Sequence, residues 1–143
     1  MFKVLVLAVL GIGAVMPAVG ADISTTEQAK ALAADVMQLI VKGQVKEAIA
    51  LLKPNWPLPD TEMDMLALQI TNQHDVVSNR FGSVVGFEFV HERHAGDFLY
   101  EVSYAEKHQR HFLHWQFYFY KADRVWLVNS VKFDDSVAPL LSP

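Results

Sequence analysis

Apolar residues in the first half of the chain recur every three or four positions, which is the spacing of amphipathic helices. Ser24-Thr25-Thr26-Glu27 has the spacing of a capping box and predicts the start of a first helix, and Gly43 is expected to end it. Its apolar stripe comprises Ala29, Leu32, Val36, Leu39 and Ile40.

A second, shorter helix is predicted up to Pro54, with Val45, Ala48, Ile49 and Leu52 on one face. The proline-rich stretch 53–59 cannot continue a regular helix and is expected to be a tight connector held by Trp56. A third helix is predicted from Asp60 or Thr61 to about Phe81-Gly82. Its stripe comprises Met63, Leu66, Ala67, Ile70, His74 and Val77.

From Gly82 onward the apolar period changes to two, which predicts strands. Turns are expected at 94–97, 107–110 and 122–124, and Gly96 suits the first of them. The predicted strands are Val84–Glu92, Phe98–Glu106, His111–Lys121 and Val125–Phe133. The expected fold is α+β, with three N-terminal helices packed on a curved four-stranded antiparallel meander sheet.

Aromatic and aliphatic residues concentrate on one face of the two central strands, which we expect to contact the helices. These residues are Phe98, Tyr100, Val102 and Tyr104 on one strand and Leu113, Trp115, Phe117 and Phe119 on the next. The opposite face carries His114, Gln116, Tyr118 and Tyr120, and it is expected to contact either solvent or a second subunit.

The segment ahead of the first helix has the order of a secretory signal: Lys3, an apolar run from Val4 to Met16, and small residues at Val19-Gly20-Ala21. The run is shorter than the roughly 20 residues of a membrane-spanning helix. We therefore expect residues 1–21 to be a cleaved signal peptide and the mature chain not to be inserted in a membrane.

Composition is consistent with a small exported domain. With 52% hydrophobic residues and no cysteine, residues 22–143 are expected to form a single domain held by its apolar core without disulfides. This favours a periplasmic or otherwise secreted location. The net charge of −4 becomes more negative when Lys3 is removed, and no basic stripe is present, which argues against nucleic acid as a partner.

The second half of the chain resembles the nuclear-transport-factor-2-like superfamily, whose curved sheet wraps its helices into a cone. The resemblance is carried by Gly82-Ser83-Val84-Val85-Gly86-Phe87-Glu88 and by the aromatic stretch from Trp115 to Trp126, which ends near Phe133-Asp134-Asp135. It implies the fold and leaves two classes of function open, small-molecule isomerases or dehydratases and non-catalytic binding or dimerisation modules. The acid–base residue sets of the enzymes have no confident match in this chain.

His74 is the sharpest candidate for chemistry, because a titratable ring on an apolar helix stripe would face the interior of the cone. It would be the base of an enzyme or a ligand contact, together with Tyr100, Tyr104, Trp115 and Phe117. The competing interpretation is a core histidine that is simply hydrogen-bonded.

Five of the six histidines lie between His91 and His114, but strand geometry argues against one shared metal site. Residues three apart on a strand point to opposite faces, which separates His111 from His114. A site at His108 and His111, with Glu106, is the remaining arrangement, and no metal or other cofactor is expected.

Two functions follow from these features. The first is a non-catalytic binding or interaction module, dimeric through the face that carries His114, Gln116, Tyr118 and Tyr120, with a small apolar ligand as a further partner. The second is an isomerase- or dehydratase-like enzyme with His74 as its base. An enclosed pocket at His74 would favour the enzyme, whereas an interior packed by Trp115 and Phe117 would favour the module.

Overall fold

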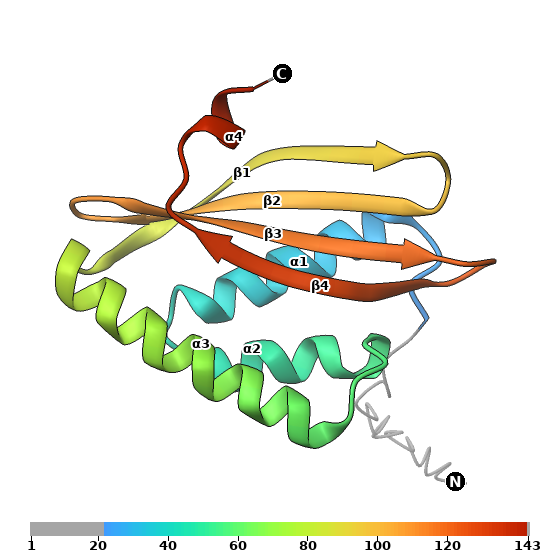
Figure 1. Ribbon diagram of the computed structural model, residues 1–143, viewed down its shortest axis with the longest axis horizontal. Coiled ribbons are helices and arrows are strands. Elements are labelled where there is room, and N and C mark those ends of the chain that lie inside the picture. The colour runs from blue at the N-terminus through green and yellow to red at the C-terminus, as the bar shows by residue number, and fades with distance from the viewer. Residues whose placement is uncertain (1–21, 143) are drawn as a thin grey trace, which may run out of the picture.

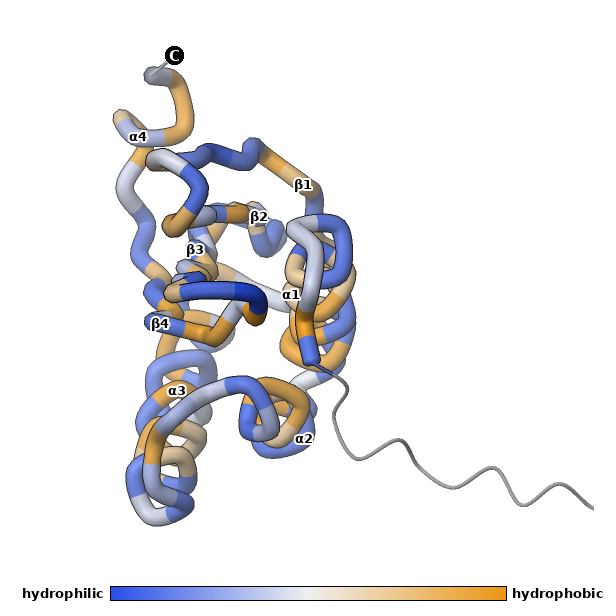
Figure 2. The backbone as a smooth tube through the Cα atoms, turned by 90° about the vertical axis from the view of Figure 1, so that its right-hand side faces the viewer, coloured by the Kyte–Doolittle hydropathy of each residue, from blue (hydrophilic) through white to orange (hydrophobic). Residues whose placement is uncertain are grey.

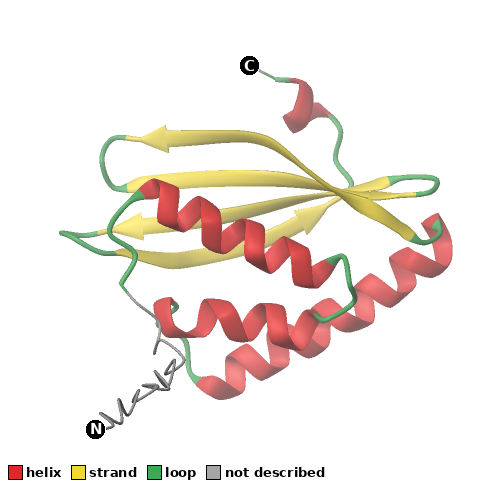
Figure 3. Ribbon diagram, turned by 180° about the vertical axis from the view of Figure 1, so that it is seen from behind, coloured by secondary structure: helices red, strands yellow, loops and turns green. Residues whose placement is uncertain are grey.

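The computed structural model describes residues 22–142, and the predicted signal peptide at 1–21 lies outside them. The helices are α1 (Thr26–Ile40), α2 (Val45–Leu52), the 3-10 turn η1 (Lys53–Asn55), α3 (Asp60–Phe81) and the short α4 (Ala138–Leu141). The strands are β1 (Val84–Ala95), β2 (Leu99–His108), β3 (Phe112–Lys121) and β4 (Trp126–Asp134). The expected α+β arrangement of three helices followed by an antiparallel sheet is confirmed (Figures 1 and 3).

The helices begin and end close to the predicted positions. The N-cap of α1 is Thr25, not Ser24, and its capping box is completed by Gln28 instead of Glu27. The predicted box was one residue out of register, because a glutamine closes it as well as a glutamate does. The predicted face of α2 is buried in full. Among residues 22–142, no helix is both long and apolar enough to cross a membrane.

The four strands pair in chain order, β1-β2-β3-β4, so β1 and β4 are the two edges of the sheet. Strand β2 runs through His108, which was predicted to lie in a turn; it is a buried strand residue instead. At the other end, β2 begins at Leu99. Phe98 was predicted to lie on the inner face, but it precedes the strand and is half exposed. Ile23 adds one bridge to the outer edge of β4, where the backbone N–H of Trp126 donates to its carbonyl at 2.8 Å.

The helices cover one face of the sheet and continue past its β4 edge. Seen from the side, α1 lies against the sheet and α3 lies below β4, with α2 between them (Figure 2). The chain beyond β4 crosses to the opposite face, where α4 lies (Figures 1 and 2). The core contains the aromatic face of β2 and β3, in which Tyr100, Trp115, Phe117 and Phe119 are all fully buried.

Candidate functional site

A cluster of polar side chains is buried where the last turns of α3 approach the C-terminal end of β2. His74 and His108 each place Nε2 next to the same carboxylate oxygen, Oε1 of Glu106, at 2.5 and 3.1 Å. The other oxygen, Oε2, accepts a hydrogen bond from the indole N–H of Trp115 at 2.7 Å. Glu106 is completely buried and the two histidines are 6% exposed. We call these four residues the Glu106 cluster.

Each member of the cluster is positioned by the local fold. His74 continues the buried stripe of α3, four residues after Ile70. Glu106 and His108 lie two residues apart on β2 and therefore share the inner face of the sheet. Trp115 enters from β3, directly opposite Tyr104. Gly82, at a φ of 89°, ends α3 and presents its carbonyl to Nδ1 of His108 at 2.9 Å.

The electrostatics of the cluster depend on a buried carboxylate. The recorded ion pairs of Glu106 within residues 22–142 are with His74 and His108, so no lysine or arginine of this region neutralises it. The hydrogen bond with Glu106 raises the pKa of His74 above its ordinary value, although burial acts in the opposite direction. The arrangement can therefore hold a proton or a metal ion between its nitrogen and oxygen atoms.

The other predicted interior residues are packed within the core and not arranged around a cavity. The hydroxyl of Tyr104 donates to the carbonyl of Lys30 at 3.2 Å, and the hydroxyl of Tyr100 donates to Glu92 at 2.7 Å. Burial raises the pKa of Tyr104 to about 12, and that of Tyr100 further still. His74, Tyr100, Tyr104, Trp115 and Phe117 are all at most 6% exposed, and none of them lines the five main hollows among residues 22–142.

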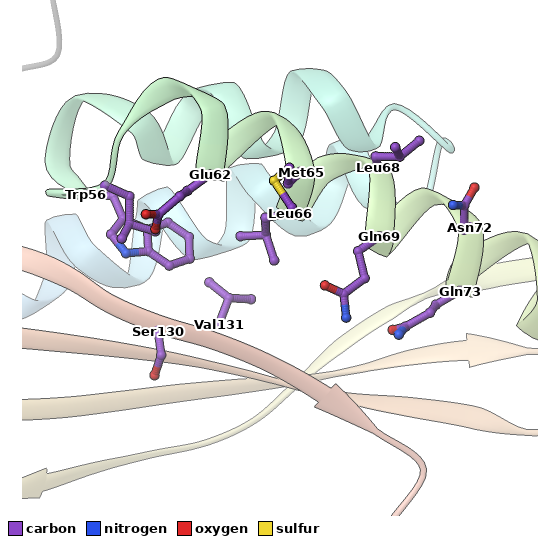
Figure 4. A pocket seen from close by; sticks show the side chains of 11 residues that line it. Trp56, Glu62, Met65, Leu66, Leu68, Gln69, Asn72, Gln73, Ser130 and Val131 are labelled. Atoms are coloured by element: carbon purple, nitrogen blue, oxygen red, sulfur yellow. The ribbon is translucent and has the colours of Figure 1, made fainter.

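The largest of the five main hollows among residues 22–142 is an open groove between α3 and the edge strand β4, which we call the α3–β4 groove. It has a volume of about 730 Å³. Leu66 and Gln69 extend from α3 toward Val131 of β4, and Trp56 lies at one end (Figure 4). Its lining includes Trp56, Leu58, Leu66, Gln69, Ser130 and Val131.

The groove continues along the whole of α3. A second hollow of about 460 Å³ shares Asn72 and Gln73 with the first and reaches Phe81. A third joins both of them through Gln73. Sequence reasoning missed this groove, because Leu66 and Val77 follow the period of the buried stripe although they are only half-buried. The signal that remained was the exposed apolar set on the same helix, Met65, Leu68 and Val76.

On the opposite face of the sheet, the proposed interface residues differ in exposure. His114 is fully buried within the single chain, Gln116 and Tyr118 are half-buried, and Tyr120 is 41% exposed. Gln116 donates to Glu101 at 3.1 Å and to the Tyr118 hydroxyl at 2.9 Å. His114 therefore offers no surface to a second subunit.

His114 is also the least satisfied polar side chain of this face. Both ring nitrogens are buried without a hydrogen-bond partner among residues 22–142, as is the hydroxyl of Ser103. Burial lowers the pKa of His114 below its ordinary value; Asp134 and Glu101 act in the opposite direction, whereas His91 and Arg93 lower it further. This histidine is a neutral, buried ring at physiological pH.

Fold and site together define an α+β protein whose helices pack on a four-stranded antiparallel sheet, with an apolar groove at one sheet edge and a buried carboxylate–imidazole cluster. This arrangement is compatible with a cone-like fold. None of the protein families, curated proteins or solved structures compared with this chain matches it.

Proposed function

We propose that this chain is a non-catalytic binding module with a nuclear-transport-factor-2-like cone, and that it binds an extended, apolar segment of polypeptide in the α3–β4 groove. The observation that carries the proposal is the groove itself, an apolar channel with a helix as one wall and the edge of a β-sheet as the other. The periplasm or the cell exterior is the compartment in which we expect it to act.

The packed interior supports binding over catalysis. A small-molecule enzyme of the isomerase or dehydratase kind would need His74 at the wall of a pocket that substrate can enter. In this chain His74 contacts Glu106, and Trp115 and Phe117 are fully buried in the core. We therefore do not assign His74 a catalytic role.

The nature of the occupant follows from the two walls. The outer edge of β4 already pairs with an extended residue, Ile23, at Trp126. Beyond Trp126, no residue within 22–142 pairs with this edge, so its backbone groups are available for an added strand. Gln69 and Gln73 on the helix wall carry amides that can hydrogen-bond the second edge of such a strand.

The dimensions of the groove agree with a peptide ligand. Helix α3 has 22 residues, so it is about 33 Å long, which is the length of roughly ten residues of extended chain. Apolar side chains of that segment would contact Leu66, Trp56 and Val131, and alternate ones would face solvent. An open, elongated channel of this kind suits a strand better than a compact apolar ligand.

Self-association is a separate part of the proposal. If the chain dimerises through the outer sheet face, the contact would involve Tyr118 and Tyr120 together with Leu127, which is 37% exposed, because His114 is already buried. Tyrosine is enriched in such interfaces. Sedimentation velocity of wild type and of Tyr120→Lys tests this, since the variant should be monomeric where wild type is a dimer.

The peptide proposal is tested by panning the purified protein against a phage library of random linear peptides about ten residues long. We expect enrichment of sequences with alternating apolar residues. A fluorescently labelled peptide from this set should bind Leu66→Asp at least about tenfold more weakly than wild type by anisotropy, because a desolvated carboxylate would contact its apolar side chains. Met65→Asp, at a position 71% exposed on the groove rim, repeats the test without disturbing the fold.

Val85→Asp is the matched control, because Val85 is an equally exposed apolar residue on β1, outside the groove. It should leave the affinity unchanged. Equal peptide binding by wild type and both groove variants would overturn the proposal. The absence of any enriched peptide would also overturn it. If, in addition, Leu66→Asp dissociated a dimer, the occupant of the groove would be a second copy of the chain.

A further inference from the structure

The Glu106 cluster contains a contact between two hydrogen-bond acceptors unless a cation lies between them. Nδ1 of His108 faces the carbonyl of Gly82 at 2.9 Å, and a carbonyl can only accept, so Nδ1 carries the hydrogen. In neutral His108 the other nitrogen, Nε2, then presents a lone pair to Oε1 of Glu106 at 3.1 Å. A carboxylate oxygen is also an acceptor, so the contact is repulsive until a positive charge enters it.

Three ligand atoms converge at this point. Nε2 of His74 and Nε2 of His108 lie 2.5 and 3.1 Å from Oε1 of Glu106. One ligand atom from each of the three residues lies within 4.8 Å of the other two. A tetrahedral zinc ion with bonds of about 2.0–2.1 Å holds its ligand atoms roughly 3.3 Å apart. Small rotations of the side chains are therefore enough to bring all three atoms to bonding distance.

The neighbours of His108 and Glu106 are those that metal ligands require. A metal-bound histidine usually donates its second ring N–H to a carbonyl or carboxylate, which fixes the nitrogen that faces the ion. His108 does so to Gly82, and Trp115 donates to Oε2 of Glu106, which leaves Oε1 as the free ligand oxygen. Two imidazoles and one carboxylate, without thiolate, form a donor set that suits Zn²⁺.

We propose that His74, Glu106 and His108 bind one Zn²⁺ ion, which links the end of α3 to the end of β2. The ion neutralises the buried carboxylate and occupies the repulsive contact between Glu106 and His108. These three residues supply three of the four ligands of a tetrahedral zinc ion, and a water would complete the site. Because the three side chains are at most 6% exposed, the ion would hold α3 to β2 and would not meet a substrate, so its role is structural. This inference does not depend on the proposed peptide binding, which concerns a different part of the molecule.

The test uses the purified protein after treatment with EDTA and dialysis into metal-free buffer. Titration with ZnCl2 alone should show saturable binding of one ion per chain by calorimetry, with a dissociation constant in the micromolar range or below, and should raise the melting temperature. Titration with CoCl2 should give the visible absorption bands of a tetrahedral site. X-ray absorption of the zinc form should show two imidazole ligands.

Variants separate this site from the surface histidines. Glu106→Gln and His108→Gln should each lower the affinity at least about tenfold, and Trp115→Phe by about 10- to 100-fold through loss of the hydrogen bond to Glu106. His94→Gln and His111→Gln are the controls, because these histidines lie outside the cluster, and they should bind zinc like wild type. If the cluster variants do not fold, the cobalt spectrum and the X-ray absorption of wild type still decide the question.

Two results would overturn the inference. The first is the absence of saturable binding of one Zn²⁺, which would mean that a proton alone supplies the charge in the cluster. The second is zinc binding that is abolished in His94→Gln or His111→Gln and unchanged in His108→Gln, which would place the ion on the surface.

Discussion

The hydrogen bond from Trp115 to Glu106 can be tested with a change that removes little else. Trp115→Phe keeps an aromatic ring in the core, where it can still stack on Phe133, whose ring lies 4.5 Å away. It removes the indole N–H, which is the donor to Oε2 of Glu106 at 2.7 Å. Glu106 is fully buried, so bulk solvent does not replace this donor.

The expected cost is the sum of two effects. The smaller ring buries roughly 40 Å² less apolar area, worth about 1 kcal/mol at 25 cal/mol per Å². A hydrogen bond to a charged group contributes about 1.5–3 kcal/mol, and the carboxylate is left without a replacement donor. Trp115→Phe should therefore lower the free energy of unfolding by about 2.5–4 kcal/mol. Trp126→Phe, whose buried indole has no hydrogen-bond partner among residues 22–142, should lose only about 1 kcal/mol.

Urea unfolding followed by far-UV circular dichroism, in metal-free buffer, measures both variants without relying on tryptophan fluorescence. A double-mutant cycle with Glu106→Gln adds a second check, since a neutral acceptor should make Trp115→Phe about 1 kcal/mol less costly. The reasoning is refuted if Trp115→Phe and Trp126→Phe are equally destabilising, or if the cycle shows no coupling.

Three further changes are predicted from the structure. His114→Phe should raise the free energy of unfolding by about 1 kcal/mol, because two unpartnered ring nitrogens leave the interior. Because the folded-state pKa of His114 lies below its unfolded value, wild type should lose stability as pH falls below about 6.5. Urea titrations at successive pH values should show a growing difference in the free energy of unfolding between His114→Phe and wild type. Gly82→Ala should cost about 1–3 kcal/mol in urea unfolding, since φ is +89° and the new Cβ would lie 2.6 Å from Oε1 of Gln109; an unchanged midpoint would contradict this. Thr25→Ala should lower the melting temperature by removing about 1 kcal/mol of capping-box stabilisation with Gln28, whereas Ser24→Ala should not.

The order and faces of the elements were predictable because each depends on local periodicity. The stripe that includes His74 and the inner faces of the central strands were recognisable from spacing alone. Most of these side chains are buried, whereas Leu66 and Val77 are half-buried and Phe98 is exposed. The same alternation, continued past Tyr104, reaches Glu106 and His108. The predicted strand ended at Glu106 and His108 was assigned to the following turn, so the strand was ended two residues too early and the signal for the Glu106 cluster was missed.

The α3–β4 groove could not be predicted in the same way. A periodic pattern shows which side of a helix is apolar, but it does not show how far the helix stands from its neighbour. Leu66 and Val77 fit the stripe of α3 as well as Ile70 does, and only the position of α3 below the sheet edge separates the half-buried residues from the buried one. That position depends on packing between distant segments.

The shared dependence on one carboxylate has a consequence for how this sequence can change. A chain that replaced Glu106 alone would keep two imidazoles and an indole N–H facing an apolar gap, and one that replaced His108 alone would leave the charge with a single partner. Related sequences that fold should therefore either keep all of these residues or replace them together by apolar side chains.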